Sequence, residues 1–448
     1  MDFNPNPPTV MHVDINSCFA TIEQQANPLL RGRPTVVAAY AEDHGCILAA
    51  SREAKKMGIT TGMRVAEARS IFRNVVVLSP DPEKYRFVNR KLRTILGSYT
   101  PNLNVESIDE MVLSLAGTPV LEKYRYQVSF PRGQESVLVL KEKADPRVKP
   151  EDDIKNAMIV LAHEIKQRIK TEIGEWITVS IGVAPNRYLA KIASNLHKPD
   201  GLDIICRQNI VQILGSLELE DLTGIKKGNG NRLRYAGITT PLALYEAAPD
   251  TLERAFHSIV GYYWFRRLHG YEDGSMYKEF GERDSEQKSF GQSHALGKPK
   301  MPADPELWQI LSQLVVKMAR RLRSDGFTAR GDGVSTMFTY SDHWHAQKMQ
   351  TTSLFADTDF YKRMHNLLLE APSRPVRILA VNCYELRHDL YEQQSLLGEE
   401  VKKERLTRAL DAISDRWGDF VVTPGRMLVM NEKVLDRIAF GRIRELNR

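Results

Sequence analysis

The sequence predicts a multidomain protein of the α+β class. At 448 residues the chain is longer than one ordinary hydrophobic core supports, so we expect two to four domains. Strand-like apolar runs are interspersed with amphipathic helical segments. The composition changes after Leu202, where short helical segments with Gly-rich joints begin, and residues 278–290 are charged and poor in apolar residues, which is typical of an interdomain linker.

The order of these elements supports that class. In the first part of the chain, strand character is expected at 9–15, 33–40, 45–51, 105–115 and 176–184, with helices at 85–99, 154–174 and 186–198. Residues 126–153 are charged and aperiodic, so we expect a surface insertion that is partly disordered. A second α+β alternation is expected from helix 305–322, strand 333–341, helix 360–371 and strand 376–386.

Composition limits the class of protein further. Hydrophobic residues make up 42% and charged residues 26%, and no apolar run is long enough to span a bilayer. The polar segment 1–10 lacks the order of a signal peptide, so we expect a cytoplasmic protein without membrane contact. Four widely separated cysteines without a Cys-x-x-Cys pair argue against a zinc site or a disulfide framework. The net charge of +6 permits a polyanionic partner.

Three acids stand out at strand ends. Asp14 ends the first strand-like run, and Asp109 and Glu110 begin the run that continues to Leu115. If these two strands are neighbours, three carboxylates converge, and such an oxygen-rich cluster suits Mg²⁺. Two ions held in this way can clamp the attacking and leaving oxygens of nucleotidyl transfer. The alternative, that these acids cap strands or pair with surface lysines, is equally compatible with their spacing.

Phosphate binding would depend on side chains, because the sequence has no P-loop. The candidates are Arg52 and Lys55 in "SREAKKMGI" and Arg187 in "PNRYLAK". Each is also compatible with a solvated surface charge.

Four motifs, in order, resemble the Y-family translesion DNA polymerases: "HVDINSCFATIE", "SREAKKMGITTGM", "ESIDEM" and "SIGVAPNRYLAKIASNLHKPDGL". The likeness runs from about His12 into the tail. It implies a right-hand polymerase with a ferredoxin-like palm (1–18 and 80–202, with the insertion 126–153), small fingers (19–79) and a helical thumb (203–277). It also implies a linker (278–290), an α+β little-finger domain (291–388) and a tail (389–448).

The resemblance assigns roles to the acids. Asp14, Asp109, Glu110 and the Ile15 backbone carbonyl would hold two Mg²⁺ ions, with Glu110 as the catalytic glutamate. A primer 3′-hydroxyl would attack the α-phosphate of a dNTP, and catalysis would consist mostly of positioning and charge neutralisation.

Phe19 falls at the position of the family's steric gate, which selects dNTPs over rNTPs, although plain core packing is the alternative. The sequence departs from its relatives in having Cys18 before the gate and in placing Arg52 and Lys55 where relatives have a Tyr and an Arg on the triphosphate.

Contacts with primer–template DNA are expected in two regions. Residues 222–238 resemble a helix-hairpin-helix whose Gly224, Lys226 and Lys227 would meet phosphates, although an ordinary helical turn fits equally well. In the little finger, five basic residues could line the duplex backbone: Lys317, Arg320, Arg321, Arg323 and Arg330.

The tail carries "QQSLL", which resembles the clamp-binding pentapeptide of bacterial polymerases, with Gln393, Leu396 and Leu397 as the contact residues of a sliding clamp. The expected function is therefore a low-fidelity, template-directed DNA polymerase that copies damaged DNA, acting as a monomer. A non-catalytic scaffold of the same family and a palm-type nucleotide cyclase are the alternatives. The three acids argue against the scaffold, and the duplex-binding segments argue against the cyclase.

Overall fold

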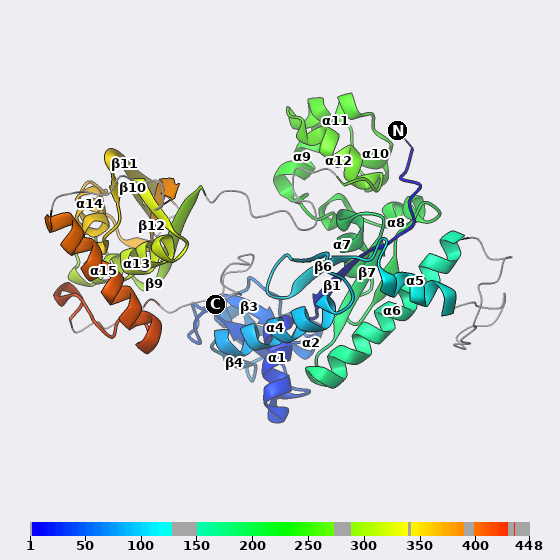
Figure 1. Cartoon of the computed structure of the whole chain (residues 1–448), viewed down its shortest axis with the longest axis horizontal. Helices are drawn as coiled ribbons and strands as arrows, with labels where there is room; N and C mark the ends of the chain where they lie inside the picture. The colour runs from blue at the N-terminus through cyan, green and yellow to red at the C-terminus, as the bar shows by residue number, and fades with distance from the viewer. Residues whose placement is uncertain are drawn as a thin grey trace. The chain divides into compact units, whose positions relative to one another are not determined.

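The computed structural model describes residues 2–127, 150–272, 288–338, 342–388, 398–428 and 434. These residues form two compact units, with 2–272 in the first and 288–434 in the second. The multidomain α+β class is therefore confirmed (Figure 1). Within the described residues, no helix has the length and apolarity needed to cross a membrane.

The first unit is built around a five-stranded sheet of order β5-β6-β1-β7-β8. Its strands are antiparallel except for the parallel pair β7–β8, and they span Leu103–Val105 (β5), Glu110–Ser114 (β6), Val10–Ile15 (β1), Val179–Ala184 (β7) and Leu202–Ile204 (β8). β1 lies at the centre, and all six of its residues are buried. Elements cover both faces of this strand, so its two polar residues, His12 and Asp14, are buried as well.

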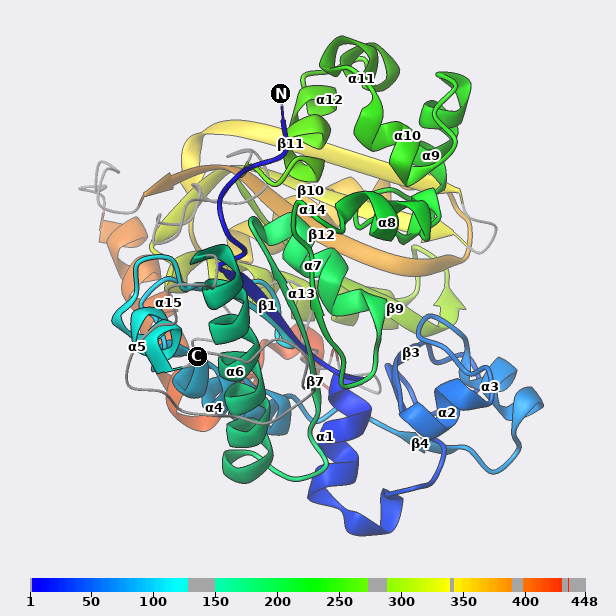
Figure 2. The same ribbon diagram turned by 90° about the vertical axis from the view of Figure 1, so that its right-hand side faces the viewer.

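Different helices cover the two faces of this sheet. Met11, Val13 and Ile15 share a core with helices α4 (Pro82–Gly97) and α6 (Pro150–Glu172), which pack on one another, with α6 nearer the viewer in Figure 2. Val10 belongs to a second core with helix α7 (Arg187–Leu196) on the other face. Because successive side chains of a strand alternate, His12 and Asp14 also face α7.

Two further parts complete the first unit. A three-stranded sheet of order β3-β2-β4 has its own small core. Its elements are β2 (Thr35–Ala38), β3 (Ile47–Ala50), α2 (Arg52–Lys56), α3 (Val65–Ile71) and β4 (Val76–Leu78), preceded by α1 (Cys18–Ala26) and η1 (Pro28–Leu30). Short helices pack on α7: α8 (Ile210–Gly215), η2 (Leu219–Asp221), α9 (Lys227–Tyr235), α10 (Pro241–Glu246), α11 (Pro249–Phe256) and α12 (Val260–Leu268). Helix α5 (Pro119–Gln127) packs on α6.

The second unit is an antiparallel sheet of order β11-β10-β12-β9 with helices on one face. Its elements are β9 (Ser289–Lys300), α13 (Pro305–Ser324), β10 (Phe327–Phe338), β11 (His343–Leu354), α14 (Asp357–Leu369), β12 (Val376–His388), α15 (Gly398–Trp417) and η4 (Gly425–Met427). Strand β9 was not predicted, and the predicted linker 278–290 overlaps its start. It is an edge strand with many exposed residues, so it lacks the apolar pattern on which strand prediction depends.

Candidate active site

The three acids lie together at one end of the central sheet. In the β1–β6 register Asp14 is directly opposite Glu110, and Asp109 immediately precedes β6. The Asp109 carbonyl accepts a hydrogen bond from the Ile15 amide at 3.0 Å, which fixes the end of the pairing. Residues directly opposite one another in an antiparallel pair point to the same face, so the carboxylates of Asp14 and Glu110 both face α7.

Each of these two carboxylates is met by a lysine. Lys198 Nζ donates to Asp14 Oδ2 at 2.6 Å, and Lys191 Nζ donates to Glu110 Oε2 at 2.6 Å. Burial raises the pKa of Asp14 to about 6, against the opposing effect of Lys198 and with a further increase from the neighbouring carboxylates. Burial also raises the pKa of Asp109.

The three acids, as the structure places them, do not by themselves have the geometry of a metal site. No cluster of three or more His, Cys, Asp or Glu side chains with metal-binding geometry occurs in the described part of the chain. The oxygen atoms of the three acids are nevertheless the ligands that a hard divalent cation prefers. The donor set therefore fits such an ion, with the two ammonium groups in positions where they neutralise the carboxylates.

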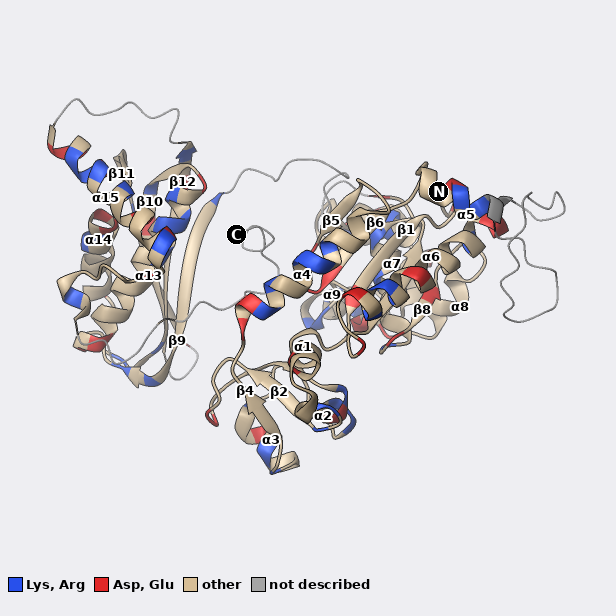
Figure 3. Cartoon of the chain, turned by 60° about the horizontal axis from the view of Figure 1, so that its bottom comes forward, with Lys and Arg blue, Asp and Glu red and all other residues tan. Residues whose placement is uncertain are grey.

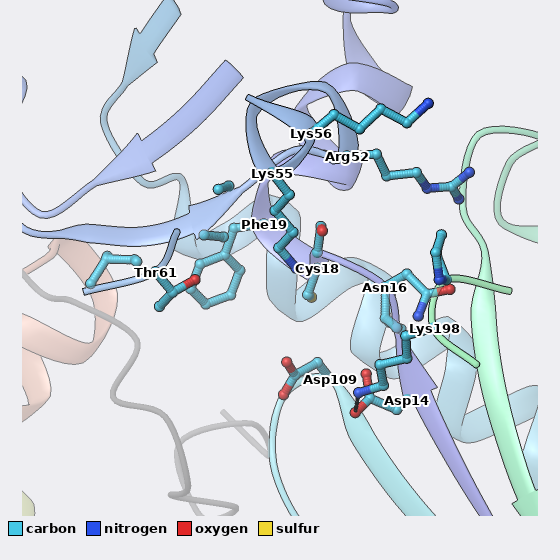
Figure 4. A pocket seen from close by; sticks show the side chains of 16 residues that line it. Asp14, Asn16, Cys18, Phe19, Arg52, Lys55, Lys56, Thr61, Asp109 and Lys198 are labelled. Atoms are coloured by element: carbon cyan, nitrogen blue, oxygen red, sulfur yellow. Dashed lines mark hydrogen bonds and ion pairs between the residues drawn. The ribbon is translucent and has the colours of Figure 1, made fainter. Parts of the chain in front are cut away.

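A cavity of about 760 Å³ opens beside two of the acids (Figure 4). Asp14, Ile15 and Asp109 line one end of it, together with Lys198, whereas Glu110 and Arg187 do not line it. Lining residues from the neighbouring part of the chain include Cys18, Phe19, Arg52, Lys55, Lys56 and Thr61. The cavity thus combines carboxylates, cationic groups and a flat aromatic wall.

Phe19 lies at the start of α1 and is only 1% exposed. Its ring stacks on Tyr85 of α4, with centroids 4.3 Å apart and an angle of 11° between the planes. It contributes to the main core of the first unit as well as to the cavity wall. The two interpretations of Phe19 are therefore compatible, since core packing holds the ring in a fixed place against the cavity.

The predicted phosphate-binding residues separate into two groups. Arg52 and Lys55 line the cavity from α2, and Arg52 donates to Thr178. Burial lowers the pKa of Lys55, and the nearby Lys198 lowers it further. The structure does not place Arg187 with them, because its side chain is 3% exposed and faces Glu106 at 3.9 Å.

Two functional candidates were missed by the sequence analysis, namely Lys191 and Lys198. Both lie in the quoted motif "NRYLAKIASNLHKPDGL", which follows β7. Asn16 brings the second of them to the site: the amide of Asp200 donates to Asn16 Oδ1 at 2.8 Å, and Asn16 Nδ2 donates to Ser180 at 2.9 Å. The available signal was the need of the acids for a positive partner, but spacing alone does not identify which lysine folds back.

The helix-hairpin-helix-like segment has an accessible tip. Gly224 adopts φ +91°, a conformation that favours glycine, and η2 and α9 flank the turn. Gly224, Lys226 and Lys227 are all exposed, and Lys227 begins α9. The helix start and the two lysines are therefore available to an anionic partner.

The basic residues of α13 require a correction. Lys317 donates to the Val434 carbonyl at 2.7 Å, Arg320 pairs with Asp415 and Asp419, and Arg323 pairs with Asp411 and Asp357. Arg321 donates to Gln292, and Arg330 is half-buried on β10. Acids of α15 and of the segment after it thus pair with Arg320 and Arg323, so these two side chains are not free for a duplex. Figure 3 shows that α15 carries both acidic and basic residues. Gln393, Leu396 and Leu397 lie outside the described residues.

Comparison with known proteins extends the argument. Residues 13–195 match the impB/mucB/samB family, and residues 287–396 match the C-terminal domain of that family. The DNA polymerase IV of Moorella thermoacetica is 30% identical over 421 residues, which cover 92% of this chain and 94% of that protein. The chain belongs to the Y family of DNA polymerases.

Further relatives of this Y-family polymerase are DNA polymerases as well. The DNA polymerase IV of Treponema denticola is 26% identical over 437 residues, covering 95% of this chain and 98% of that protein. A solved Y-family DNA polymerase chimera of Dbh and Dpo4 has a TM-score of 0.65 at 23% identity and covers 84% of this chain and 98% of that chain. At this level of identity, the similarity to the solved chimera shows a shared fold.

Membership determines the general activity. This protein is a template-directed DNA polymerase of the translesion type that acts in DNA repair, and enzymes of its family are metal-dependent nucleotidyltransferases. No finding favours the non-catalytic scaffold.

Proposed function

We propose that this Y-family polymerase adds dNTPs to a primer 3′-hydroxyl with two Mg²⁺ ions held by Asp14, Asp109, Glu110 and the Ile15 carbonyl. The observation that carries the proposal is the β1–β6 register, which sets Asp14 opposite Glu110 and leaves Asp109 beside them at the mouth of the cavity. All the donors are oxygen atoms, as Mg²⁺ requires. When bound, Mg²⁺ supplies charge neutralisation for the transferred phosphate and activates the primer hydroxyl.

The cationic residues of the cavity would hold the triphosphate. Lys198 pairs with Asp14 through a single contact and lines the same cavity as Arg52 and Lys55. Once a divalent cation neutralises Asp14, the Lys198 ammonium is free to bind a phosphate oxygen. The low dielectric of the partly enclosed cavity strengthens each of these interactions. Arg187 is left out of this set because it faces Glu106.

Phe19 would act as the sugar selector. Its ring forms part of the cavity wall, and the stacked Tyr85 behind it blocks retreat. A ribose 2′-hydroxyl that points at a ring held in this way collides with it, whereas a deoxyribose does not. Close packing makes such a clash expensive, since the interior has no space for the ring to enter.

We also propose DNA contacts on different elements from those of α13. Gly224, Lys226 and Lys227 form one exposed basic tip. In the second unit, the sheet face opposite the helices carries His343, His345 and Ser335, with His345 paired to Ser335 in the register. These small or polar side chains are compatible with close approach of a phosphate backbone. A sliding clamp would bind Gln393–Leu397.

The decisive experiment is primer extension with Mg²⁺ and dNTPs, comparing the wild type with Asp109→Ala/Glu110→Ala. We expect extension to fall at least 10³-fold, because electrostatic stabilisation at the transferred phosphate is lost. Glu175→Ala is the matched control, since Glu175 is an exposed carboxylate that pairs with Arg31 in the same unit. If the double variant extends normally, the acids do not hold the catalytic metals. If the wild type binds DNA but does not extend it, the scaffold interpretation replaces this proposal.

A further inference from the structure

Glu110 lies on the face of the sheet that contacts α7, as Asp14 does, but it does not line the cavity. Its Oε2 accepts from Lys191 Nζ at 2.6 Å, and neither residue lines the cavity that Asp14 and Lys198 share. The pair is partly accessible, with side-chain exposures of 24% for Lys191 and 21% for Glu110. Lys191 and Lys198 therefore neutralise different acids.

The position of Lys191 depends on an unusually close approach of α7 to the sheet. A Cβ atom on Gly182 of β7 would lie 2.0 Å from the Ala190 carbonyl oxygen and 2.2 Å from the Ser194 amide nitrogen. Only glycine allows the helix backbone to contact the strand backbone at this point. The contact places the middle of α7, and with it Lys191, over the end of β1 and β6.

A buried hydrogen-bond chain fixes the same turn of the helix. Ser194 Oγ donates to the Lys191 carbonyl at 2.9 Å and lies 3.0 Å from His12 Nδ1. Since the single hydroxyl hydrogen is used, we assign the imidazole hydrogen to Nδ1. His12 Nε2 is then a bare acceptor with no hydrogen-bond partner, 4.0 Å from Glu110 Oε2.

Glu110 Oε2 therefore has a hydrogen-bond donor, Lys191, on one side and an acceptor, His12 Nε2, on another. The acceptor atom of His12 cannot donate to the carboxylate, so the protein's hydrogen bond to Oε2 comes from the Lys191 ammonium. Two acceptors that face one another repel, which keeps the carboxylate turned toward the lysine. His12 is 1% exposed and has no room to turn away.

We propose that Lys191 is a positioning residue that takes the place of a cation on Glu110 in the metal-free enzyme, so that metal binding there exchanges an ammonium for a divalent ion. This inference rests on the proposed metal site. Lys198 can pass from Asp14 to a phosphate in the cavity. Lys191 does not line that cavity, so its charge stays near Glu110 and opposes the incoming ion. Lys191 thus orders the carboxylate at the expense of metal affinity.

The test measures metal binding without turnover. The thermal unfolding midpoint of the full chain is followed during MgCl₂ titration at constant ionic strength, without DNA or nucleotide. Lys191→Met should need about tenfold less Mg²⁺ for half of its stabilisation than the wild type, because one positive charge beside the site is gone. Lys191→Gln serves the same purpose if the Met variant does not fold. Lys191→Arg keeps the charge and should behave as the wild type does.

Two controls separate the possible outcomes. Lys403→Met removes a lysine that pairs with Asp359 in the second unit, and it should leave the Mg²⁺ midpoint unchanged. Lys191→Met/Glu110→Gln should lose the gain, because the exchange takes place on Glu110. An unchanged or higher Mg²⁺ requirement in Lys191→Met overturns the inference while leaving the metal site intact. If Mg²⁺ stabilises no variant, including the wild type, both the inference and the proposed metal site fail.

Discussion

At the scale of single residues, the site is organised around the cost of burying carboxylates. Asp14 is 7% exposed in the central strand, and a buried carboxylate needs a positive partner. Lys198 supplies it at Asp14, and Lys191 supplies it at Glu110. A catalytic cation would replace both ammonium groups with a stronger charge, which is why the same acids serve folding and catalysis.

The raised pKa of Asp14 predicts a pH dependence of metal binding. Its carboxyl has a pKa of about 6, above the usual value of 3.8, so protons compete with the cation below pH 6. We expect the apparent Mg²⁺ affinity to fall about tenfold per pH unit below that value and to level off above it. Mg²⁺ titration of thermal unfolding between pH 5 and pH 7.5 measures this. An affinity that is constant across the range would contradict it.

The same shift has the opposite effect on the stability of the metal-free fold. Because the folded-state pKa lies above the unfolded value, the folded protein takes up the proton first, and this group favours folding more at pH 5 than at pH 7. Urea unfolding of the wild type and Asp14→Asn at both pH values isolates the contribution, which should be absent from the variant.

Phe19 predicts a change of sugar selection. Phe19→Ala opens the cavity wall in front of Tyr85 and removes the proposed clash with a 2′-hydroxyl. We expect rNTP incorporation to rise at least 100-fold relative to dNTP incorporation, with a stability loss of about 3 kcal/mol from the deleted ring. Single-nucleotide extension with dNTP or rNTP gives the ratio. Ile95→Ala in the same core is the control for instability, and unchanged selection in Phe19→Ala would remove Phe19 from the gate.

At the scale of elements, packing on both faces of the central sheet positions the site. β1 places alternate residues against α4 and α6 on one face and against α7 on the other. The catalytic face is the one on which polar residues of β1 meet α7. In the second unit, a neighbouring helix neutralises part of a basic cluster. Asp415 and Asp411 of α15 pair with Arg320 and Arg323 of α13.

Gly182 is the element-level position most sensitive to substitution. In Gly182→Ala the new methyl group would meet backbone atoms of α7, which cannot give way as a flexible side chain does. We expect a loss of about 3 kcal/mol in the free energy of unfolding, because either the helix or the strand must shift to admit the methyl group. Urea unfolding measures this loss. Gly215→Ala is the matched control, since nothing lies within 4 Å of the position of its Cβ; equal effects of the two variants would refute the close-approach argument.

At the scale of the whole molecule, the chain divides into two units with separate hydrophobic cores. The first combines the catalytic sheet, the cavity and the exposed basic tip, whereas the second is a helix-covered sheet that includes α15. Changes confined to the second unit therefore leave the cavity and the three acids in place. The cavity and all three acids belong to the first.

Deletion of Gln393–Leu397 is expected to separate clamp dependence from synthesis. The deleted residues carry the clamp-binding resemblance and no catalytic acid, so basal extension should stay within twofold of the wild type while stimulation by a sliding clamp is lost. Extension assays with and without clamp supply both measurements in one experiment. Equal clamp-dependent processivity in the deletion variant would count against the motif.

The sequence by itself determined the α+β class, most of the strands and helices of the first unit, and the three acids, because these depend on local periodicity and on residue type at strand ends. Only the tertiary structure decided which cations meet which acids. Lys198 reaches Asp14 across a separation of 184 residues, and Arg187 faces Glu106. Arg320 and Arg323 of α13 pair with acids of α15. Such pairings follow from how elements fold back on one another. Local patterns contain no information about that arrangement. The edge strand β9 was missed for another reason, since its many exposed residues give no apolar pattern.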